Sequence, residues 1–231
     1  MTIDLWSLVV FSVQVALGGV LLTLPVGVTL GFWLARTNRR GKSIVETLAT
    51  LPLVLPPTVV GLFLLELFGR NRPLGRFLYE SFGLSIAFTW RAVVVASAVV
   101  AFPLLVRTVR ASFEDIDPRL EAIARTLGKG PFSVFVTVSL PLASRGILAG
   151  FILAFSRALG EFGATIMVAG NIPGETQTLS LAIFQLVQLG RDPEAYRLAA
   201  VTVLVALAAI WLAERLARRP RSRQISRASS A

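Results

Sequence analysis

Two charged side chains lie inside one of the long apolar runs of this sequence. Arg157 and Glu161 are four residues apart, so in a helix they share one face. Charges within a membrane are costly and usually face the interior of a helix bundle or a water-filled cavity. The arginine could attract an anion, whereas the carboxylate would repel one. We therefore expect Glu161 to neutralise Arg157 and hold the helix in register, and Arg157 itself is a candidate for contact with an anion.

Residues for most other chemistry are absent. The 231 residues include neither Cys nor His, which excludes disulfides, thiolate nucleophiles, imidazole bases and the commonest transition-metal ligands. The stretch RRGKS (39–43) ends like a phosphate-binding loop, but Arg36 occupies the position of its first glycine and no strand precedes it. We expect no catalytic residue, no cofactor, no metal site and no ATP hydrolysis by this chain.

The elements that must position these residues are membrane-spanning helices. Hydrophobic residues make up 55% of the chain, charged residues 16%, and the mean hydropathy is +0.73, which is too apolar for a soluble domain of this size. A helix needs about 20 apolar residues to cross the hydrocarbon core. Five segments meet that length, and each should be helical because lipid cannot satisfy backbone polar groups: 11–35, 47–68, 86–107, 142–169 and 196–216.

Basic residues set the predicted orientation. The net charge of +10 is distributed between the apolar runs rather than over one soluble face, so it indicates membrane topology and not binding to nucleic acid. With the N-terminus outside, fifteen basic residues fall on the cytoplasmic side and five outside, as the positive-inside rule requires. The expected transmembrane domain is 1–219. The segment 220–231, rich in Arg and Ser, is expected to be a disordered cytoplasmic tail.

A short polar helix is predicted between the third and fourth spans, on the cytoplasmic side. Asp117-Pro118 is a typical helix start and Gly128 a typical stop. Between them Leu120, Ile123, Ala124 and Leu127 follow the spacing of one apolar face, and Glu121 and Arg125 form an i, i+4 pair. A helix this short must dock against something, either the membrane surface or a groove on a cytoplasmic partner. Its small residues favour the partner.

Several segments carry a family resemblance. The sequence Glu121-Ala122-Ile123-Ala124, with Gly128 seven residues after the glutamate and then Leu140-Pro141, resembles the EAA loop of permease subunits in binding-protein-dependent ABC importers. The resemblance implies an all-α permease of the type I importer fold, in which this loop (117–141) is the coupling helix that inserts into a cytoplasmic ATPase. Ile123 departs from the plain motif, which has alanine there. The implied coupling residues are Asp117, Pro118, Leu120, Glu121, Ala122, Ala124, Leu127 and Gly128.

The resemblance covers nearly the whole chain. LPLVLPPTVVG (51–61), FTWRAVVVASAVVAFPLLVR (88–107), RALGEFGAT (157–165) and NIPGETQT (171–178) are similar to permeases of molybdate importers in the bacterial inner membrane, with sulfate as the nearest rival substrate. The family implies two permease copies over two ATP-binding subunits, an external oxyanion-binding protein, and import of molybdate or tungstate by alternating access. A membrane-embedded enzyme and a passive channel are the alternatives from other classes. The enzyme is disfavoured by the absence of His and Cys and of a pair of carboxylates that converge in the membrane, and the channel would leave the capped cytoplasmic helix unexplained.

The translocation path is the remaining prediction. Prolines in the second span remove backbone donors, and such breaks often line the path of a transporter or merely kink a helix. The family resemblance implies that substrate affinity resides in the external binding protein, so the path needs only weakly polar groups. Each of these groups could equally be an ordinary packing residue. The candidates are Pro56, Pro57, Ser156, Arg157, Glu161, Thr165, Asn171 and Thr176.

Overall fold

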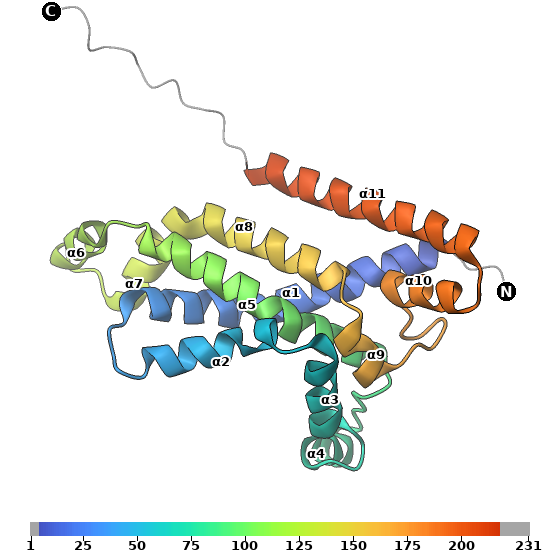
Figure 1. Ribbon diagram of the computed structural model, residues 1–231. Helices are drawn as coiled ribbons and strands as arrows, with labels where there is room; N and C mark the ends of the chain where they lie inside the picture. The colour runs from blue at the N-terminus through green and yellow to red at the C-terminus, as the bar shows by residue number, and fades with distance from the viewer. Residues whose placement is uncertain (1–4, 218–231) are drawn as a thin grey trace, which may run out of the picture.

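The architecture is a bundle of long helices. The computed structural model describes residues 5–217, so the predicted tail, 220–231, lies outside the described residues. Four helical stretches are long and apolar enough to cross a membrane: Leu5–Arg36, Trp90–Glu114, Pro131–Leu159 and Asp192–Trp211. They correspond to helices α1 (Leu5–Arg36), α5 (Trp90–Glu114), α8 (Leu140–Leu159) and the first part of α11 (Asp192–Ala217), which run along a common direction in Figure 1.

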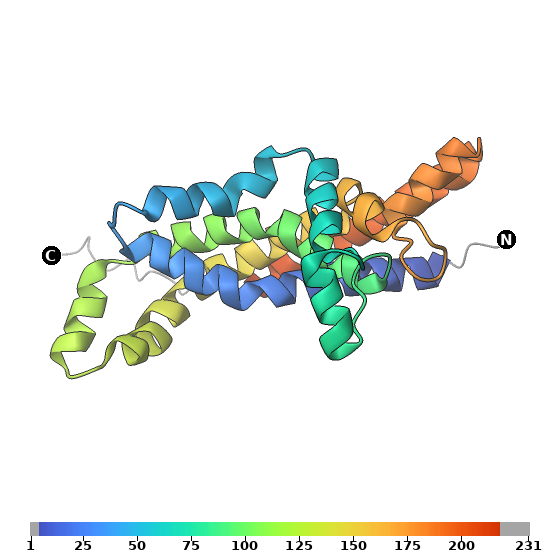
Figure 2. The same ribbon diagram turned by 90° about the horizontal axis from the view of Figure 1, so that it is seen from below.

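The expected second span is broken. Instead of one helix over 47–68, the chain forms α2 (Lys42–Val54) and α3 (Pro57–Phe68), which are bent by 110° relative to each other. Pro57 has no N–H, and a proline disfavours helical backbone at the residue before it. Leu55 and Pro56 are accordingly extended, with ψ of 142° and 133°. Together α2 and α3 give a fifth apolar stretch, and α3 runs across the direction of the bundle (Figures 1 and 2).

The expected fourth span also has different limits. The helix begins at Pro131 rather than near 142, passes through α7 (Pro131–Val134) and a π-helical turn (Phe135–Ser139), and continues as α8 to Leu159. Pro141 cannot donate a backbone hydrogen bond, and Leu140 N donates to Phe135 O with the five-residue spacing of a π-helix. The expected end, 160–169, is instead a separate short helix, α9 (Gly163–Ala169).

Helix α5 is the centre of the bundle and packs between α1 and α8. Its buried residues include Ala101, Leu105, Val109 and Phe113, which join one apolar cluster with residues of α1 and α8. At one end of this cluster three aromatic rings meet. Phe32 of α1 lies 5.1 Å from Phe113 and 4.8 Å from Phe135, measured between ring centroids. The ends of α1 and α5 and the π-helical turn are therefore packed together.

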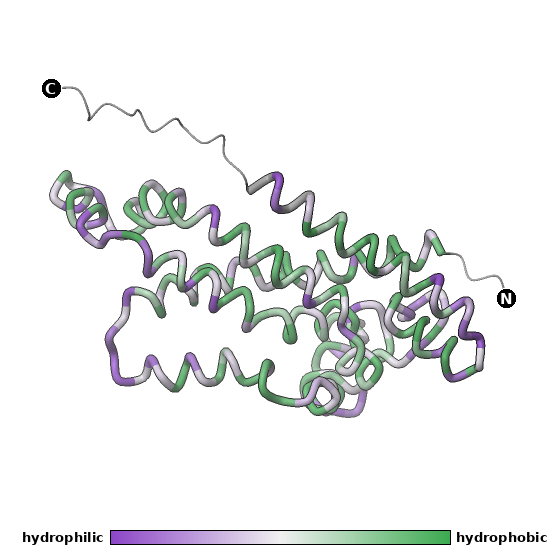
Figure 3. Tube along the Cα trace, turned by 45° about the horizontal axis from the view of Figure 1, so that its top comes forward, coloured by the Kyte–Doolittle hydropathy of each residue, from purple (hydrophilic) through white to green (hydrophobic). Residues whose placement is uncertain are grey.

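The two ends of the bundle carry different elements. At one end lie the 37–41 loop and α6 (Pro118–Thr126), with α7 following; we call this the α6 end. Near the opposite end lie the start of α1 and α10 (Leu179–Gln188), and α4 (Pro73–Phe82) follows α3 (Figure 1). Figure 3 shows hydrophilic residues gathered at the connections and hydrophobic residues along the long helices. This distribution is typical of a protein that crosses a membrane several times.

Candidate functional site

The ends of α6 are fixed by local hydrogen bonds. Asp117 precedes the helix, and its carboxylate accepts a hydrogen bond of 2.9 Å from the backbone N–H of Arg119. At the other end Gly128 has a φ of +84°, and the N–H groups of Gly128 and Lys129 donate to the carbonyls of Arg125 and Ala124. These two bonds form a Schellman motif, which favours glycine at its left-handed residue.

The faces of α6 differ from the expected pattern at Glu121 and Ala124. Glu121 and Ala124 are its buried residues. The larger apolar side chains are exposed instead: Leu120 by 45%, Ile123 by 56% and Leu127 by 77%. Helix α6 therefore lies against its own chain through a carboxylate and a methyl group, and its leucine and isoleucine side chains are exposed. The helix itself lies at the α6 end of the bundle (Figure 2).

Glu121 binds two residues that the sequence did not connect with it. Its Oε1 accepts hydrogen bonds from Nε and Nη2 of Arg36, at 3.0 and 2.8 Å, and from the hydroxyl of Ser139 at 2.8 Å. Arg36 ends α1, and Ser139 ends the π-helical turn. The expected pair with Arg125 is replaced by this inward one among the described residues. We call Arg36, Glu121 and Ser139 the inner node.

A second set of predicted residues lies where two helices are interrupted. A Cβ atom on Gly163 would lie 2.9 Å from the Cβ of Pro57, so the break between α8 and α9 lies against the break between α2 and α3. Pro56 and Pro57 are both exposed at this point. One turn further, a Cβ on Gly61 would lie 2.6 Å from the carbonyl oxygen of Ala164. Helices α3 and α9 can approach this closely because residue 61 has no side chain.

Arg157 and Glu161 are paired at the same break. Nη1 of Arg157 lies 2.7 Å from Oε2 of Glu161, and the Glu161 side chain is only 2% exposed. The other carboxylate oxygen, Oε1, accepts a hydrogen bond of 2.8 Å from the backbone N–H of Ala164 at the start of α9. Glu161 therefore neutralises Arg157 and also satisfies a backbone donor that the helix start leaves free. Ser156, next to Arg157, is half-buried.

The remaining path candidates lie on α9 and in the loop after it. The hydroxyl of Thr165 and the carbonyl oxygen of Asn171 are buried and have no hydrogen-bond partner in the described part of the chain. Thr176 is fully buried, and its hydroxyl accepts from the backbone N–H of Ile172, which stabilises the loop. Asn171 donates to Gln185, which also accepts a hydrogen bond from Gln177. Sequence reasoning missed both glutamines.

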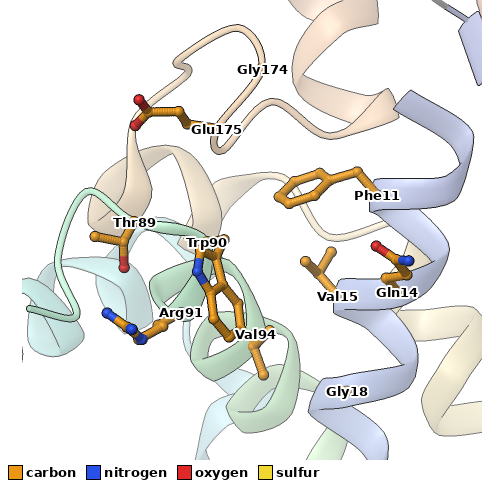
Figure 4. A pocket seen from close by; sticks show the side chains of 10 residues that line it. All are labelled: Phe11, Gln14, Val15, Gly18, Thr89, Trp90, Arg91, Val94, Gly174 and Glu175. Atoms are coloured by element: carbon orange, nitrogen blue, oxygen red, sulfur yellow. The ribbon is translucent and has the colours of Figure 1, made fainter. Parts of the chain in front are cut away.

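A cavity opens near the end of the bundle away from α6. It has a volume of about 580 Å³ and lies between the first half of α1, the start of α5 and the 170–178 loop. Figure 4 shows the Trp90 indole between Phe11 and Val15 on one side and Thr89 and Arg91 on the other, with Glu175 on the loop above. Its lining residues are Phe11, Gln14, Val15, Gly18, Thr89, Trp90, Arg91, Val94, Gly174 and Glu175.

The path candidates fall into two groups. The pair at the helix break comes from α8, whereas Asn171 and Thr176 belong to the loop and are bonded within it. Arg36 and Ser139 had no local signal of their own. The sequence explained Arg36 as one of the basic residues that set membrane topology, and only the fold brings it to Glu121, 85 positions later.

Comparison with known proteins gives consistent results. Residues 27–222 match the family model described as "Binding-protein-dependent transport system inner membrane component". The chain is 46% identical over 214 residues to the molybdenum transport system permease protein ModB of Haemophilus influenzae, which covers 92% of this chain and 93% of that protein. The corresponding Escherichia coli protein is 45% identical over 219 residues, covering 94% and 96% of the two chains.

Solved structures share the fold. A chain of the inward-facing MetNI methionine ABC transporter superimposes with a TM-score of 0.68 at 18% identity, covering 93% of both chains. A chain from a bacterial ABC transporter that imports alginate gives a TM-score of 0.69 at 16% identity, covering 92% of this chain and 79% of the other. At these identities the likeness concerns the arrangement of helices alone.

Proposed function

The chain belongs to the family of binding-protein-dependent transport system inner membrane components, and we propose that it is the permease subunit of an importer for molybdate and, with it, tungstate. The observation that carries this proposal is the identity of nearly half, over almost the full length of both chains, to permeases of molybdenum transport systems. Sulfate is the competing substrate, because it is also a tetrahedral dianion. The fold supports a permease rather than an enzyme.

Energy for import comes from separate ATP-binding subunits, of which two copies bind a pair of permeases. The phosphate-binding motif is absent from this sequence, and α6 is the element that contacts the ATPase. Three features support that role: sharply defined helix ends, a position at one extremity of the bundle, and an outward face of Leu120, Ile123 and Leu127. A helix in a groove is bound through such spaced apolar side chains.

The α6 end faces the cytoplasm in this proposal, and the N-terminus lies outside. The distribution of basic residues supports this orientation. The cavity around Trp90 then opens near the outer surface, where an external binding protein delivers the ion. The ion passes the paired helix breaks at Pro57 and Gly163, near Ser156, Arg157 and Thr165. Because Glu161 already neutralises Arg157, this path holds the dianion weakly and allows its release.

The substrate is tested in proteoliposomes that contain the permease, its ATP-binding subunit and its binding protein. Molybdate or tungstate should stimulate ATP hydrolysis more strongly than sulfate at the same concentration. Equal or greater stimulation by sulfate would refute the assignment of molybdate.

The role of α6 is tested separately with Ile123→Asp. A carboxylate on the outward face should prevent recovery of the ATP-binding subunit with the purified permease, because it would be buried without a partner in an apolar groove. Ile123→Leu is the matched control, since it keeps an apolar side chain of the same size at the same exposed position. Normal recovery with Ile123→Asp would show that this face does not bind the ATPase.

A further inference from the structure

The inner node attaches α6 to the rest of the chain through a buried ion pair. Only two residues of this helix, Glu121 and Ala124, are buried. Glu121 receives three hydrogen bonds at one oxygen, from groups that lie 85 and 18 positions away in the sequence. Nη2 of Arg36 also lies 3.4 Å from the carbonyl oxygen of Ile116, which directly precedes the cap of α6. The arginine therefore holds both the helix and the turn that leads into it.

Burial distinguishes this ion pair from those on the surface. The side chains of Glu121 and Arg36 are 6% and 20% exposed, and Ser139 is fully buried. The pairs Arg72–Glu66 and Arg76–Glu80 are at least 50% exposed. A buried carboxylate that loses its cation is left without compensation, whereas an exposed one is solvated by water. Moving α6 away from Arg36 is therefore unfavourable in a way that moving a surface pair is not.

The groups that hold Glu121 belong to a closely packed part of the bundle. Phe32 lies one turn before Arg36 on α1, and Phe135 begins the π-helical turn that Ser139 ends. Their rings are 4.8 Å apart, and both pack against Phe113 of α5. A force on α6 is thus passed through Glu121 to the ends of two spans that are already packed together.

We propose that Arg36 and Ser139 are positioning residues for coupling: through Glu121 they fasten α6 to the end of α1 and to the π-helical turn before α8, so that movement of α6 moves both spans. The proposal rests on the proposed role of α6 as the contact with the ATPase. It assigns Glu121 an internal task in this chain, because its carboxylate faces Arg36 and Ser139 and not outward.

The first measurement uses the permease alone and does not depend on any partner. Because the chain has no cysteine, Asn38→Cys and Thr126→Cys provide the sole sites for nitroxide labels, one in the loop after α1 and one on α6. The distance distribution between the labels should be narrow in the parent chain and broad with Arg36→Met or Glu121→Gln. Arg40→Met, which removes a charge from the same loop at an exposed position, should leave it unchanged. Unchanged distances with Arg36→Met would overturn the fastening.

The second measurement uses the complex with the ATP-binding subunit and binding protein. Arg36→Met should lose most of the stimulation of ATP hydrolysis by loaded binding protein, while the ATP-binding subunit is still recovered. Ser139→Ala should lose less, because one of three donors is removed. The exchange Arg36→Glu with Glu121→Arg should restore stimulation. Full stimulation with Arg36→Met, or failure of the exchange to restore any, would overturn the positioning role.

The two measurements separate the possible failures. If the parent permease never binds an ATP-binding subunit, the proposed function fails, while the label distances still decide whether Arg36 fastens α6. If Arg36→Met does not fold, Arg36→Lys takes its place. An ammonium group keeps the charge but cannot reproduce the guanidinium contacts, so stimulation should be lower than in the parent. Stimulation equal to that of the parent would contradict the proposal.

Discussion

Gly163 lies directly against Pro57. A Cβ atom placed on the glycine would be only 2.9 Å from the Cβ of the proline. Two spans that are far apart in the sequence are therefore interrupted at the same place. The interruption of one has a physical cause in its Pro-Pro pair, and the other is bridged by Glu161, which accepts a hydrogen bond from the first turn of α9. Backbone polar groups at such breaks are satisfied by neighbouring protein groups rather than by lipid.

Close packing of α3 on α9 leads to a first prediction. Gly61→Val should destabilise the permease by about 1–3 kcal/mol, because its Cβ would lie 2.6 Å from the carbonyl oxygen of Ala164. Thermal unfolding in detergent would measure the loss. Gly41→Ala, at a position with no neighbouring atom within 4 Å, is the control. An unfolding temperature equal to that of the parent would mean that α3 and α9 are not in contact.

The stop of α6 gives a second prediction. Gly128→Val should reduce recovery of the ATP-binding subunit and ion uptake, because a left-handed residue with a β-branched side chain costs roughly 1–2 kcal/mol or more. Gly130→Val is matched to it: a Cβ has open space at both positions, but φ is +84° at Gly128 and −68° at Gly130. Equal uptake by the two variants would show that the helix stop is unimportant for coupling.

The buried pair of α8 gives a third prediction, for a double-mutant cycle. Arg157→Ala should lower the stability by about 3–5 kcal/mol, since it leaves the carboxylate of Glu161 buried without its cation. The double variant Arg157→Ala with Glu161→Ala should be less destabilised than the sum of the single variants. The exposed pair Arg76–Glu80 should show a coupling of only about 0.2–1 kcal/mol. Additive effects at Arg157 and Glu161 would exclude an energetic pairing.

Orientation is the fourth prediction. A reporter that is active only outside the membrane should be active when fused after Gly190 and inactive when fused after Lys129. The reason is the excess of basic residues in the loops at the α6 end. The reverse pattern would place α6 on the wrong side for an ATPase.

The fold class and the local structure of α6 were predictable from the sequence. Apolar length determines which segments can span a membrane, and the resemblance identified the fold that the solved transporter structures share. Asp117 and Gly128 act through hydrogen bonds between residues at most two turns apart, so the neighbouring sequence is enough to predict their effects. Such local signals need no knowledge of the tertiary structure.

The partner of Glu121 and the burial of Ala124 were not predictable in the same way. The i, i+4 spacing suggests that Glu121 pairs with Arg125. In the fold, however, Glu121 is buried against the end of α1 and pairs with Arg36 instead. The apolar spacing places Leu120, Ile123, Ala124 and Leu127 on one face for docking outside the chain; Leu120, Ile123 and Leu127 are exposed accordingly, whereas Ala124 is buried. Here the inward positions are Glu121 and Ala124, and the apolar side chains are left for another surface. The 110° bend at Pro56 is also a tertiary result, because α3 packs against α9.

The π-helical turn from Phe135 to Ser139 sets the rotation of everything before it relative to α8. Such a turn closes over five residues where an α-helix closes over four, so it accommodates one residue more than the helix around it. If the same residues formed an ordinary α-helix instead, the chain on one side would be rotated by about 100° relative to the other, the angle of one helical residue. Phe135 and Ser139 could then no longer face Phe32 and Glu121 together. The number of residues in this turn thus determines the angle by which α8 is rotated relative to the segment that precedes the turn.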